Sequence, residues 1–223
     1  MSPLPCLLPA AAYLYGSIPF GFLLVLKIKG VDLRTVGSGN IGATNAARVL
    51  GLRWFPVVFA LDFTKGLLPA LAARMLLPAE GAYDPHPLAV AAAAAGILGH
   101  VFPVYLKFKG GKAVAAGTGA FLVLTPVPLG VAALTWAVVF AIGRYVSMAS
   151  MLAAATLASS AWWLVPDATG RGVFGAGAAT AGAILVIALH RANIRRLLEG
   201  REHRIGRRTG QRQEPPAPPG GTA

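Results

Sequence analysis

The stretch "AVAAGTGAFLVLTPVPLGVAALTWAVVFAIG", residues 113–143, decides the fold because it fixes how many times the chain crosses a membrane. Its 31 residues exceed the roughly 20 that one transmembrane helix needs. Pro126 and Pro128 interrupt the apolar run, and proline kinks or ends a helix. The stretch therefore predicts either one kinked span or two short spans.

The composition indicates a membrane protein. Of the 223 residues, 56% are hydrophobic and 13% are charged, and the mean hydropathy of +0.64 lies outside the usual range of a soluble domain. Five further apolar segments are long enough to cross a bilayer. They cover residues 4–26, 54–77, 88–106, 148–165 and 173–189.

The positions of the lysines and arginines decide between six and seven spans, because such residues concentrate on cytoplasmic loops. With seven spans and an external N-terminus, 17 of the 20 lie on inner loops and only Arg171 lies outside, with Lys65 and Arg74 left inside a span. With six spans, nine fall on each side. We therefore predict an all-α, polytopic integral membrane protein with seven transmembrane helices, its N-terminus outside and its C-terminus cytoplasmic.

The two ends of the chain are predicted to differ in order. Residues 1–205 form the predicted membrane domain, and residues 206–223, basic at first and then rich in Pro and Gly, are predicted to be a disordered cytoplasmic tail. The N-terminus "MSPLPC" lacks the basic region of a signal peptide, so the first span is expected to persist as a helix.

Several classes of ligand are not expected. Topology and anionic lipid headgroups explain most of the net charge of +12, so we predict no binding of nucleic acid. Cys6 is the only cysteine, and the His and acidic residues show no metal-ligand spacing, so no metal or cofactor is predicted. Nothing in the sequence implies an obligate protein partner.

The segment "VGSGNIGATN", residues 36–45, has the G-x-G-x-x-G spacing of a dinucleotide-binding turn, with Asp62 at the distance of a ribose-binding acid. Such a turn needs a strand before it and a helix after it in a βαβ unit, whereas here membrane spans flank it. Asp62 falls inside a span, three residues before Lys65, and we interpret the two as an ion pair facing the bundle. A direct role of this pair in chemistry is the alternative.

The glycines of this segment still allow successive N–H groups to point at an anion. Neighbouring side chains add hydrogen-bond donors and a guanidinium, so we predict a phosphate site, with a flexible polar connector as the alternative. The predicted phosphate-binding residues are Gly37, Ser38, Gly39, Asn40, Gly42, Thr44, Asn45 and Arg48.

A second inner loop repeats this chemistry. Gly110 and Gly111 precede Lys112, which is expected to open a span and to offer free N–H groups and an ammonium to an anion. Lys107 and Lys109 are interpreted as topology charges, that is, as basic residues that keep this loop on the cytoplasmic side and bind no substrate.

Two more polar clusters lie on the same predicted side. His190 and Asn193 share a face if the last helix continues beyond residue 189, and Ser147 and Ser150 share a face of another helix. The four clusters together predict a cytoplasmic site for a small, phosphate-bearing substrate, beside an apolar bundle able to hold a lipid chain.

Three long motifs carry a resemblance to a known family. "GSGNIGATNAARVLG" (37–51), "GHVFPVYLKFKGGKAVA" (99–115) and "HRANIRRLLEGREHRIG" (190–206) resemble the motifs of the bacterial acyl-phosphate:glycerol-3-phosphate acyltransferases, the PlsY family. "LDFTKG" (61–66) and "RYVSMAS" (144–150) look like its intervening segments.

The resemblance implies seven transmembrane helices, an external N-terminus and an active site on the cytoplasmic face of the bacterial inner membrane. It also implies transfer of a fatty acyl chain from a long-chain acyl phosphate to the sn-1 hydroxyl of glycerol 3-phosphate. The products would be lysophosphatidate and inorganic phosphate, in the first acylation step of phospholipid biosynthesis. Both substrates and the membrane lipids are the implied partners.

The resemblance assigns catalytic roles to Ser38, Arg48, Lys112, His190 and Asn193, and places the substrate phosphates among the polar residues named above, with Ser147 or Ser150. Ala113 departs from the family, which has a glycine there. Alanine either firms the start of the helix or alters a close approach to phosphate.

The donor suggests the mechanism. An acyl phosphate is already activated, and among the four histidines none has an Asp five positions later, the spacing of the general base in related soluble-donor enzymes. We hypothesise positioning and charge stabilisation, with a substrate phosphate oxygen taking the hydroxyl proton. The alternatives are His190 as base, Ser38 as a nucleophile activated by His190, an organic-phosphate transporter and a structural membrane protein.

Overall fold

The computed structural model describes residues 4–76, 87–165 and 172–206, with side chains from Leu7 onward. Within these ranges the chain is helical and has no strand, so the all-α class is confirmed and no βαβ unit surrounds the glycine-rich turn. The predicted tail lies outside the described residues apart from Gly206. The α-helices are α1 (Leu4–Gly16), α2 (Phe20–Lys29), α3 (Ala43–Leu50), α4 (Phe55–Leu76), α5 (Pro87–Val101), α6 (Val114–Leu124), α7 (Pro126–Gly143), α8 (Val146–Leu164), α9 (Gly172–Leu189) and α10 (Arg191–Leu198), with short 3-10 helices η1 (Leu33–Thr35), η2 (Leu52–Trp54) and η3 (Val104–Leu106).

The deciding stretch forms two helices, α6 and α7, separated at Thr125. Pro126 occupies the first position of α7, where its missing N–H costs nothing. The 11 residues of α6 rise about 16 Å, roughly half of a bilayer core, so α6 is apolar but shorter than a typical transmembrane helix. The predicted count of seven spans and the orientation stay predictions, and within the described residues five helical segments are long and apolar enough to cross a bilayer. They are residues 7–29, 52–76, 87–106, 126–143 and 172–189.

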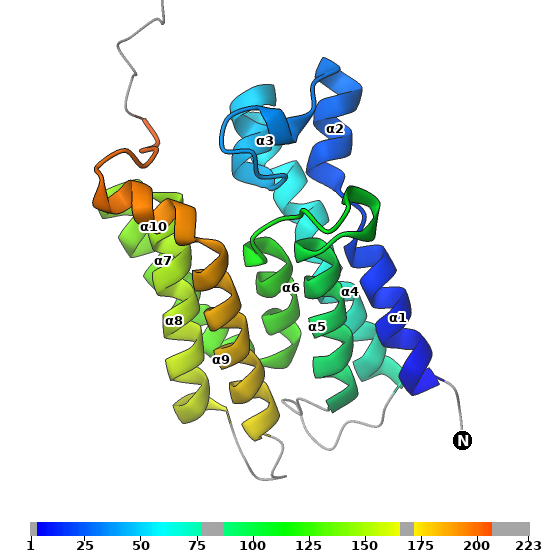
Figure 1. Ribbon diagram of the computed structural model, residues 1–223. Coiled ribbons are helices and arrows are strands. Elements are labelled where there is room, and N and C mark those ends of the chain that lie inside the picture. The colour runs from blue at the N-terminus through cyan, green and yellow to red at the C-terminus, as the bar shows by residue number, and fades with distance from the viewer. Residues whose placement is uncertain (1–3, 77–86, 166–171, 207–223) are drawn as a thin grey trace, which may run out of the picture.

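The first predicted span is not one continuous helix. It breaks into α1 and α2 at Ser17–Pro19, because proline lacks an N–H and disfavours helical geometry in the residue before it. Ser17 Oγ donates a hydrogen bond to the Tyr13 carbonyl at 2.8 Å, which pairs the buried hydroxyl with a carbonyl at the end of α1. After the break α2 runs in a different direction from α1 and packs beside α3 (Figure 1).

The helices form two groups (Figure 1). One group contains α1, α4, α5 and α6, and the other contains α7, α8 and α9. Contacts between the groups are sparser and involve α5 or α6 on one side and α7 or α9 on the other. This division leaves room for a site between the groups.

Small residues hold the first group together. A Cβ on Gly66 of α4 would lie 1.9 Å from the Ala116 carbonyl oxygen of α6, and one on Gly96 of α5 would lie 2.1 Å from the Lys65 carbonyl oxygen of α4. Such close backbone approach between apolar helices is typical of membrane proteins. The tight packing makes α4, α5 and α6 a firm wall for the site.

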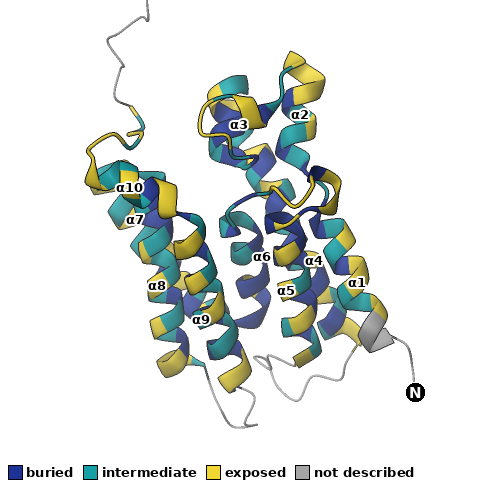
Figure 2. Cartoon of the chain, in the orientation of Figure 1, coloured by how far each residue is buried: buried dark blue, intermediate teal, exposed yellow. Residues whose placement is uncertain are grey.

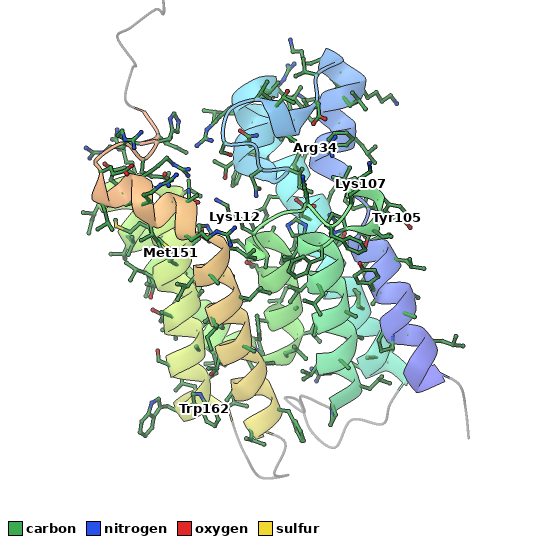
Figure 3. All side chains as sticks on the ribbon, viewed as in Figure 1. Arg34, Tyr105, Lys107, Lys112, Met151 and Trp162 are labelled. Atoms are coloured by element: carbon green, nitrogen blue, oxygen red, sulfur yellow. The ribbon has the colours of Figure 1, made fainter. Side chains whose placement is uncertain are left out.

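The outer surface of the bundle is apolar. Trp163, Met75, Leu134 and Ile184 are each at least 65% exposed, and exposed positions follow the outer faces of the helices (Figure 2). A helix that is apolar on all sides matches a lipid environment rather than water. The polar side chains of the described helices are mostly directed to the end of the bundle where α3, α8 and α10 begin (Figure 3).

Candidate active site

A cavity of about 440 Å³ lies between the two helix groups at this end. Most of the predicted phosphate-binding residues line it, which brings together four segments that are far apart in the sequence. Gly39, Gly110 and Gly111 do not line it. The predicted residues that do are Gly37, Ser38, Asn40, Gly42, Thr44, Asn45, Arg48, Lys112, Ser147, Ser150, His190 and Asn193.

The first turns of four helices contribute to the cavity wall. They are represented by Thr44 of α3, Val114 of α6, Ser147 of α8 and Asn193 of α10. The N-terminal end of a helix carries unpaired N–H groups and a partial positive charge. The backbone therefore makes the cavity favourable for an anion before any side chain is considered.

Asn45 folds the glycine-rich segment around itself. This side chain is 2% exposed, and its Nδ2 donates to the carbonyl oxygens of Leu33, Val36 and Asn40 at 3.2, 3.0 and 2.9 Å. Its Oδ1 accepts a hydrogen bond from the Ser38 backbone N–H at 3.0 Å. Asn45 therefore fixes the path of the segment and holds Ser38 at the cavity edge.

Two glycines of this segment adopt a left-handed backbone. Gly37 has φ of 60°, and a Cβ there would lie 2.2 Å from Asn45 Oδ1. Gly39 has φ of 69°, and its N–H donates to the Val36 carbonyl within the turn. Gly39 thus shapes the segment from outside the cavity wall.

The Gly-Gly-Lys loop differs from the prediction in two respects. The α6 helix begins at Val114 rather than at Lys112, and the Gly111 N–H is not free, because it donates to the His100 carbonyl at 3.0 Å. Ala113 does not firm the start of α6, since it precedes the helix with φ of 66°, a left-handed conformation that is unfavourable for an L-residue.

Lys112 crosses the cavity to α10, which follows α9 of the second helix group. Its Nζ donates a hydrogen bond to Asn193 Oδ1 of α10 (Figure 3). Lys107 and Lys109 of the same loop are exposed and do not line the cavity, which agrees with their interpretation as topology charges.

Glu202, which the sequence did not single out, organises the far wall. Its Oε1 accepts hydrogen bonds from Ser147 Oγ and Asn193 Nδ2, both at 2.7 Å, and its Oε2 accepts one from Arg196 Nε at 2.7 Å. Because the Asn193 amide donates to Glu202, its oxygen faces Lys112. A chain of contacts therefore runs from Glu202 through Asn193 to Lys112.

A backbone contact anchors the segment that carries Glu202. The Ile205 N–H donates to the Arg144 carbonyl at 3.0 Å, in the turn between α7 and α8. The segment after α10 is thus fixed across the start of α8 and closes one side of the cavity.

The charges in the cavity shift the pKa values of its titratable groups. Burial lowers the pKa of Lys112 to about 8, with Arg196 and Arg48 acting in the same direction and Glu202 opposing them. Burial acts to raise the pKa of Glu202, but the hydrogen bonds from Asn193 and its neighbours outweigh it and hold that pKa below its usual value. The cavity therefore keeps a net positive charge while Lys112 is protonated.

His190 lies where α9 ends rather than within a continuing helix, because the chain turns there into α10. Its Nδ1 lies 2.7 Å from the Val186 carbonyl oxygen, which can only accept, so Nδ1 carries the proton and Nε2 carries the lone pair. Burial lowers the pKa of His190 to about 4, so the imidazole is neutral at neutral pH. His190 and Asn193 nevertheless both face the cavity, as predicted.

An apolar groove of about 320 Å³ continues from the cavity between α6 on one side and α7, α8 and α9 on the other. Its walls include Phe121 of α6, Leu129 of α7, Leu157 of α8 and Val186 of α9. Cavity and groove share the lining residues Phe55, Phe59, Val114, Trp136 and Ser150. A molecule with a charged head and an apolar chain can therefore occupy both.

Other cavity residues were also missed. Arg196 and Glu202 lie inside the third quoted motif, which also contains Glu199, so the sequence carries no signal that singles out Glu202. His100, which the sequence did not single out, also lines the cavity, and so does Asp62, which the sequence placed in an ion pair facing the bundle. Trp136 has no signal in the sequence, because its Nε1 reaches Ser150 Oγ, at 3.3 Å, only through the packing of α7 against α8.

Residues 6–200 match the family model described as glycerol-3-phosphate acyltransferase. The chain belongs to this family. It is 45% identical over 193 residues to the glycerol-3-phosphate acyltransferase of Myxococcus xanthus, with 86% of this chain and 95% of the relative covered. It is 43% identical over 194 residues to that of Aquifex aeolicus, with 87% and 95% covered.

Two solved structures of the family are similar in fold. The crystal structure of PlsY, an integral membrane glycerol 3-phosphate acyltransferase, in its glycerol 3-phosphate form has a TM-score of 0.80 and 40% identity, with 91% of this chain and 96% of that chain covered. The lysophosphatidic acid form of PlsY has a TM-score of 0.77 and 39% identity, with 91% and 95% covered. The PlsY family assignment made from the motifs is thus confirmed, and the protein is an integral membrane acyltransferase.

Proposed function

We propose that this protein transfers a fatty acyl chain from a long-chain acyl phosphate to the sn-1 hydroxyl of glycerol 3-phosphate. The hydroxyl oxygen attacks the carbonyl carbon of the acyl phosphate and forms the ester bond. The bond from that carbon to the phosphate oxygen breaks, and inorganic phosphate leaves. The products are lysophosphatidate and inorganic phosphate.

The observation that carries the proposal is the shared wall of the cavity and the groove. An acyl phosphate has a dianionic head and a long apolar chain, and Val114, Trp136 and Ser150 stand where these two environments meet. The carbonyl carbon between head and chain would lie beside these residues. Glycerol 3-phosphate, which has no chain, needs only the polar cavity.

The phosphates would be held by the positive groups of the cavity. Lys112, Arg48 and Arg196 lie on different elements around it, and hydroxyl and amide donors complete the wall. Such preorganised donors stabilise the charge that builds up on the leaving phosphate. Positioning of the two substrates in one cavity supplies a further part of the rate.

The pKa of His190 supports proton transfer to a substrate phosphate. With a pKa of about 4, the imidazole is a weaker base than a phosphate monoester, whose second pKa is about 6. His190 Nε2 then serves to orient the hydroxyl as a hydrogen-bond acceptor. In a pH–rate series the acidic limb of kcat should persist in His190→Ala, and its loss would assign the base role to His190.

A mechanism through an acyl-enzyme at Ser38 is the alternative. Within the described residues no hydrogen bond joins Ser38 to His190, which such a mechanism needs. Rapid quenching under saturating donor distinguishes the two routes. Direct transfer predicts no burst of protein-bound acyl chain, whereas an acyl-enzyme predicts one.

The donor is tested with purified protein reconstituted in lipid. The protein is incubated with glycerol 3-phosphate and either a long-chain acyl phosphate or the matching acyl-CoA, and lysophosphatidate is measured. We expect product with acyl phosphate only. Product from acyl-CoA alone would overturn the donor assignment.

The orientation is part of the proposal. We place the cavity on the cytoplasmic face of the bacterial inner membrane in a seven-span protein, supported by the excess of basic residues around it. Membrane-impermeant labelling of cysteine variants in intact cells tests this placement. Residues 38–48 and residues 107–112 should both be protected from outside, and labelling of either segment would contradict it.

A further inference from the structure

Three buried polar side chains lie next to the cavity, inside the first helix group, and two of them, Asp62 and His100, also line it. Asp62 and Lys65 of α4 form the predicted ion pair, with 2.7 Å between Lys65 Nζ and Asp62 Oδ1. His100 of α5 joins them, since its Nδ1 lies 3.2 Å from Lys65 Nζ and 3.5 Å from Asp62 Oδ1. All three are at most 3% exposed, and the mechanism above uses none of them.

The contacts define the protonation of His100. An ammonium has only donors, so Lys65 donates to His100 Nδ1, and the ring proton lies on Nε2. A second Lys65 donor serves Asp62, and the ammonium lies 5.0 Å from the centre of the Phe20 ring. The ion pair therefore holds the imidazole in one position with its Nε2 edge directed away from Lys65.

That edge faces the Gly-Gly-Lys loop. A Cβ on Gly111 would lie 1.9 Å from His100 Nε2, and the Gly111 N–H donates to the His100 carbonyl at 3.0 Å. A Cβ on Gly110 would instead lie 2.2 Å from the His100 carbonyl oxygen and 2.5 Å from both the Val101 carbonyl oxygen and Pro103 Cδ, and none of these atoms belongs to the His100 side chain. Both glycines are therefore fitted to His100, one to its ring and the other to the main chain.

We propose that His100, oriented by Asp62 and Lys65, is a positioning residue that sets the path of the Gly110–Gly111 backbone and thereby the place of the Lys112 ammonium in the cavity. The loop leaves no room for another path, because the imidazole and the α5 carbonyls fill the space on its inner side. The inference rests on glycerol 3-phosphate binding in this cavity. It gives a function to the intramembrane ion pair.

The test uses the different neighbours of the two glycines. Gly111→Ala should lower kcat/KM for glycerol 3-phosphate by about 100-fold, the loss expected of a misplacement of about 1 Å, and most of this loss should appear as a higher KM because Lys112 is assigned to binding. Adding His100→Ala should recover at least about tenfold of this loss, because the new methyl group then occupies the space of the imidazole. Gly110→Ala should not be recovered by His100→Ala, because its methyl group meets no atom of the His100 side chain. Gly130→Ala, where an added Cβ has nothing within 4 Å, is the control and should match the wild type.

Two readouts separate this inference from the proposed reaction. The affinity for glycerol 3-phosphate, measured by calorimetry without donor, should change across the variants in the same pattern as KM. If the wild type binds glycerol 3-phosphate but does not turn over acyl phosphate, the donor assignment is wrong and the inference about His100 is unaffected. If Gly111→Ala does not yield folded protein, recovery of folded, binding-competent protein by His100→Ala is the expected result. The proposal is overturned if the double variant is no better than Gly111→Ala, or if His100→Ala rescues both glycine variants equally.

Discussion

The pH dependence of glycerol 3-phosphate binding is a direct test of Lys112. Its pKa of about 8 means that its charge is lost within an accessible pH range, whereas an arginine guanidinium is not normally deprotonated in proteins. Glycerol 3-phosphate is a dianion throughout this range, because its second pKa is about 6. The affinity should therefore fall as pH rises through the pKa of Lys112.

The size of the effect follows from the protonated fraction. The apparent dissociation constant is the intrinsic constant divided by the fraction of competent protein. With a pKa of about 8, Lys112 is about 90% protonated at pH 7 and about 9% protonated at pH 9. Hence KM and the dissociation constant for glycerol 3-phosphate should rise about tenfold between these pH values, provided that uncharged Lys112 does not support binding.

Calorimetry without donor is the appropriate assay, because it avoids hydrolysis of acyl phosphate at alkaline pH. Lys112→Arg is the matched variant, since arginine keeps its charge up to pH 12. This variant should bind glycerol 3-phosphate more weakly at every pH, because the guanidinium has a different shape from the ammonium. Its dissociation constant should not rise at alkaline pH. A flat wild-type profile up to pH 9.5, or an equal rise in Lys112→Arg, would refute the reasoning.

Three further changes test other parts of the site. Glu202→Gln removes a negative charge that raises the pKa of Lys112. The dissociation constant for glycerol 3-phosphate should therefore begin to rise at a lower pH than in the wild type, and an unchanged midpoint of this rise would argue against electrostatic coupling between Glu202 and Lys112. Ala113→Gly should relieve about 1–2 kcal/mol of left-handed strain, less about 0.4–1 kcal/mol for the added freedom of the unfolded chain. The middle of the net range, about 0.8 kcal/mol, corresponds to a rise in the melting temperature in detergent of about 2–3 °C, and a melting temperature below that of the wild type would contradict the strain. Ala154→Phe fills the apolar groove, so the rate of transfer from a long-chain acyl phosphate should fall about tenfold or more relative to the rate from a short-chain one. Ala155→Phe, at an exposed position outside the groove, is the control and should leave the ratio of these two rates unchanged.

The sequence predicted features that depend on local spacing. The separation of Asp62 and Lys65 by three residues placed both on one helical face, and the structure joins them at 2.7 Å. Proline spacing likewise placed the division of residues 113–143 close to Pro126. These relations need only the geometry of one helix, so no knowledge of the tertiary fold was required.

Features that depend on packing between distant segments could not be predicted. His100 lies 35 residues from Lys65, and Glu202 lies 55 residues from Ser147, so only the assembled bundle brings these pairs together. The left-handed backbone of Ala113 is another such case, because alanine favours the helix in which the sequence placed it. The end of α9 at His190 also runs against local preference, since no proline or glycine stands there.

The basic residues show why topology and chemistry cannot be separated in the sequence of such a protein. Successive spans return the chain alternately to the two membrane faces, so the loops that are basic for reasons of orientation are also the loops that meet at one end of the bundle. Lys109 and Lys112 are three residues apart in one loop, yet the first is exposed and the second crosses a cavity to Asn193. What distinguishes them is the fixed backbone between them, where Gly110 and Gly111 pack against His100. Among the basic residues of this loop, Lys112 is thus the one that faces the cavity, and we infer that the buried framework, rather than the number of charges, selects it as the lysine proposed to bind phosphate.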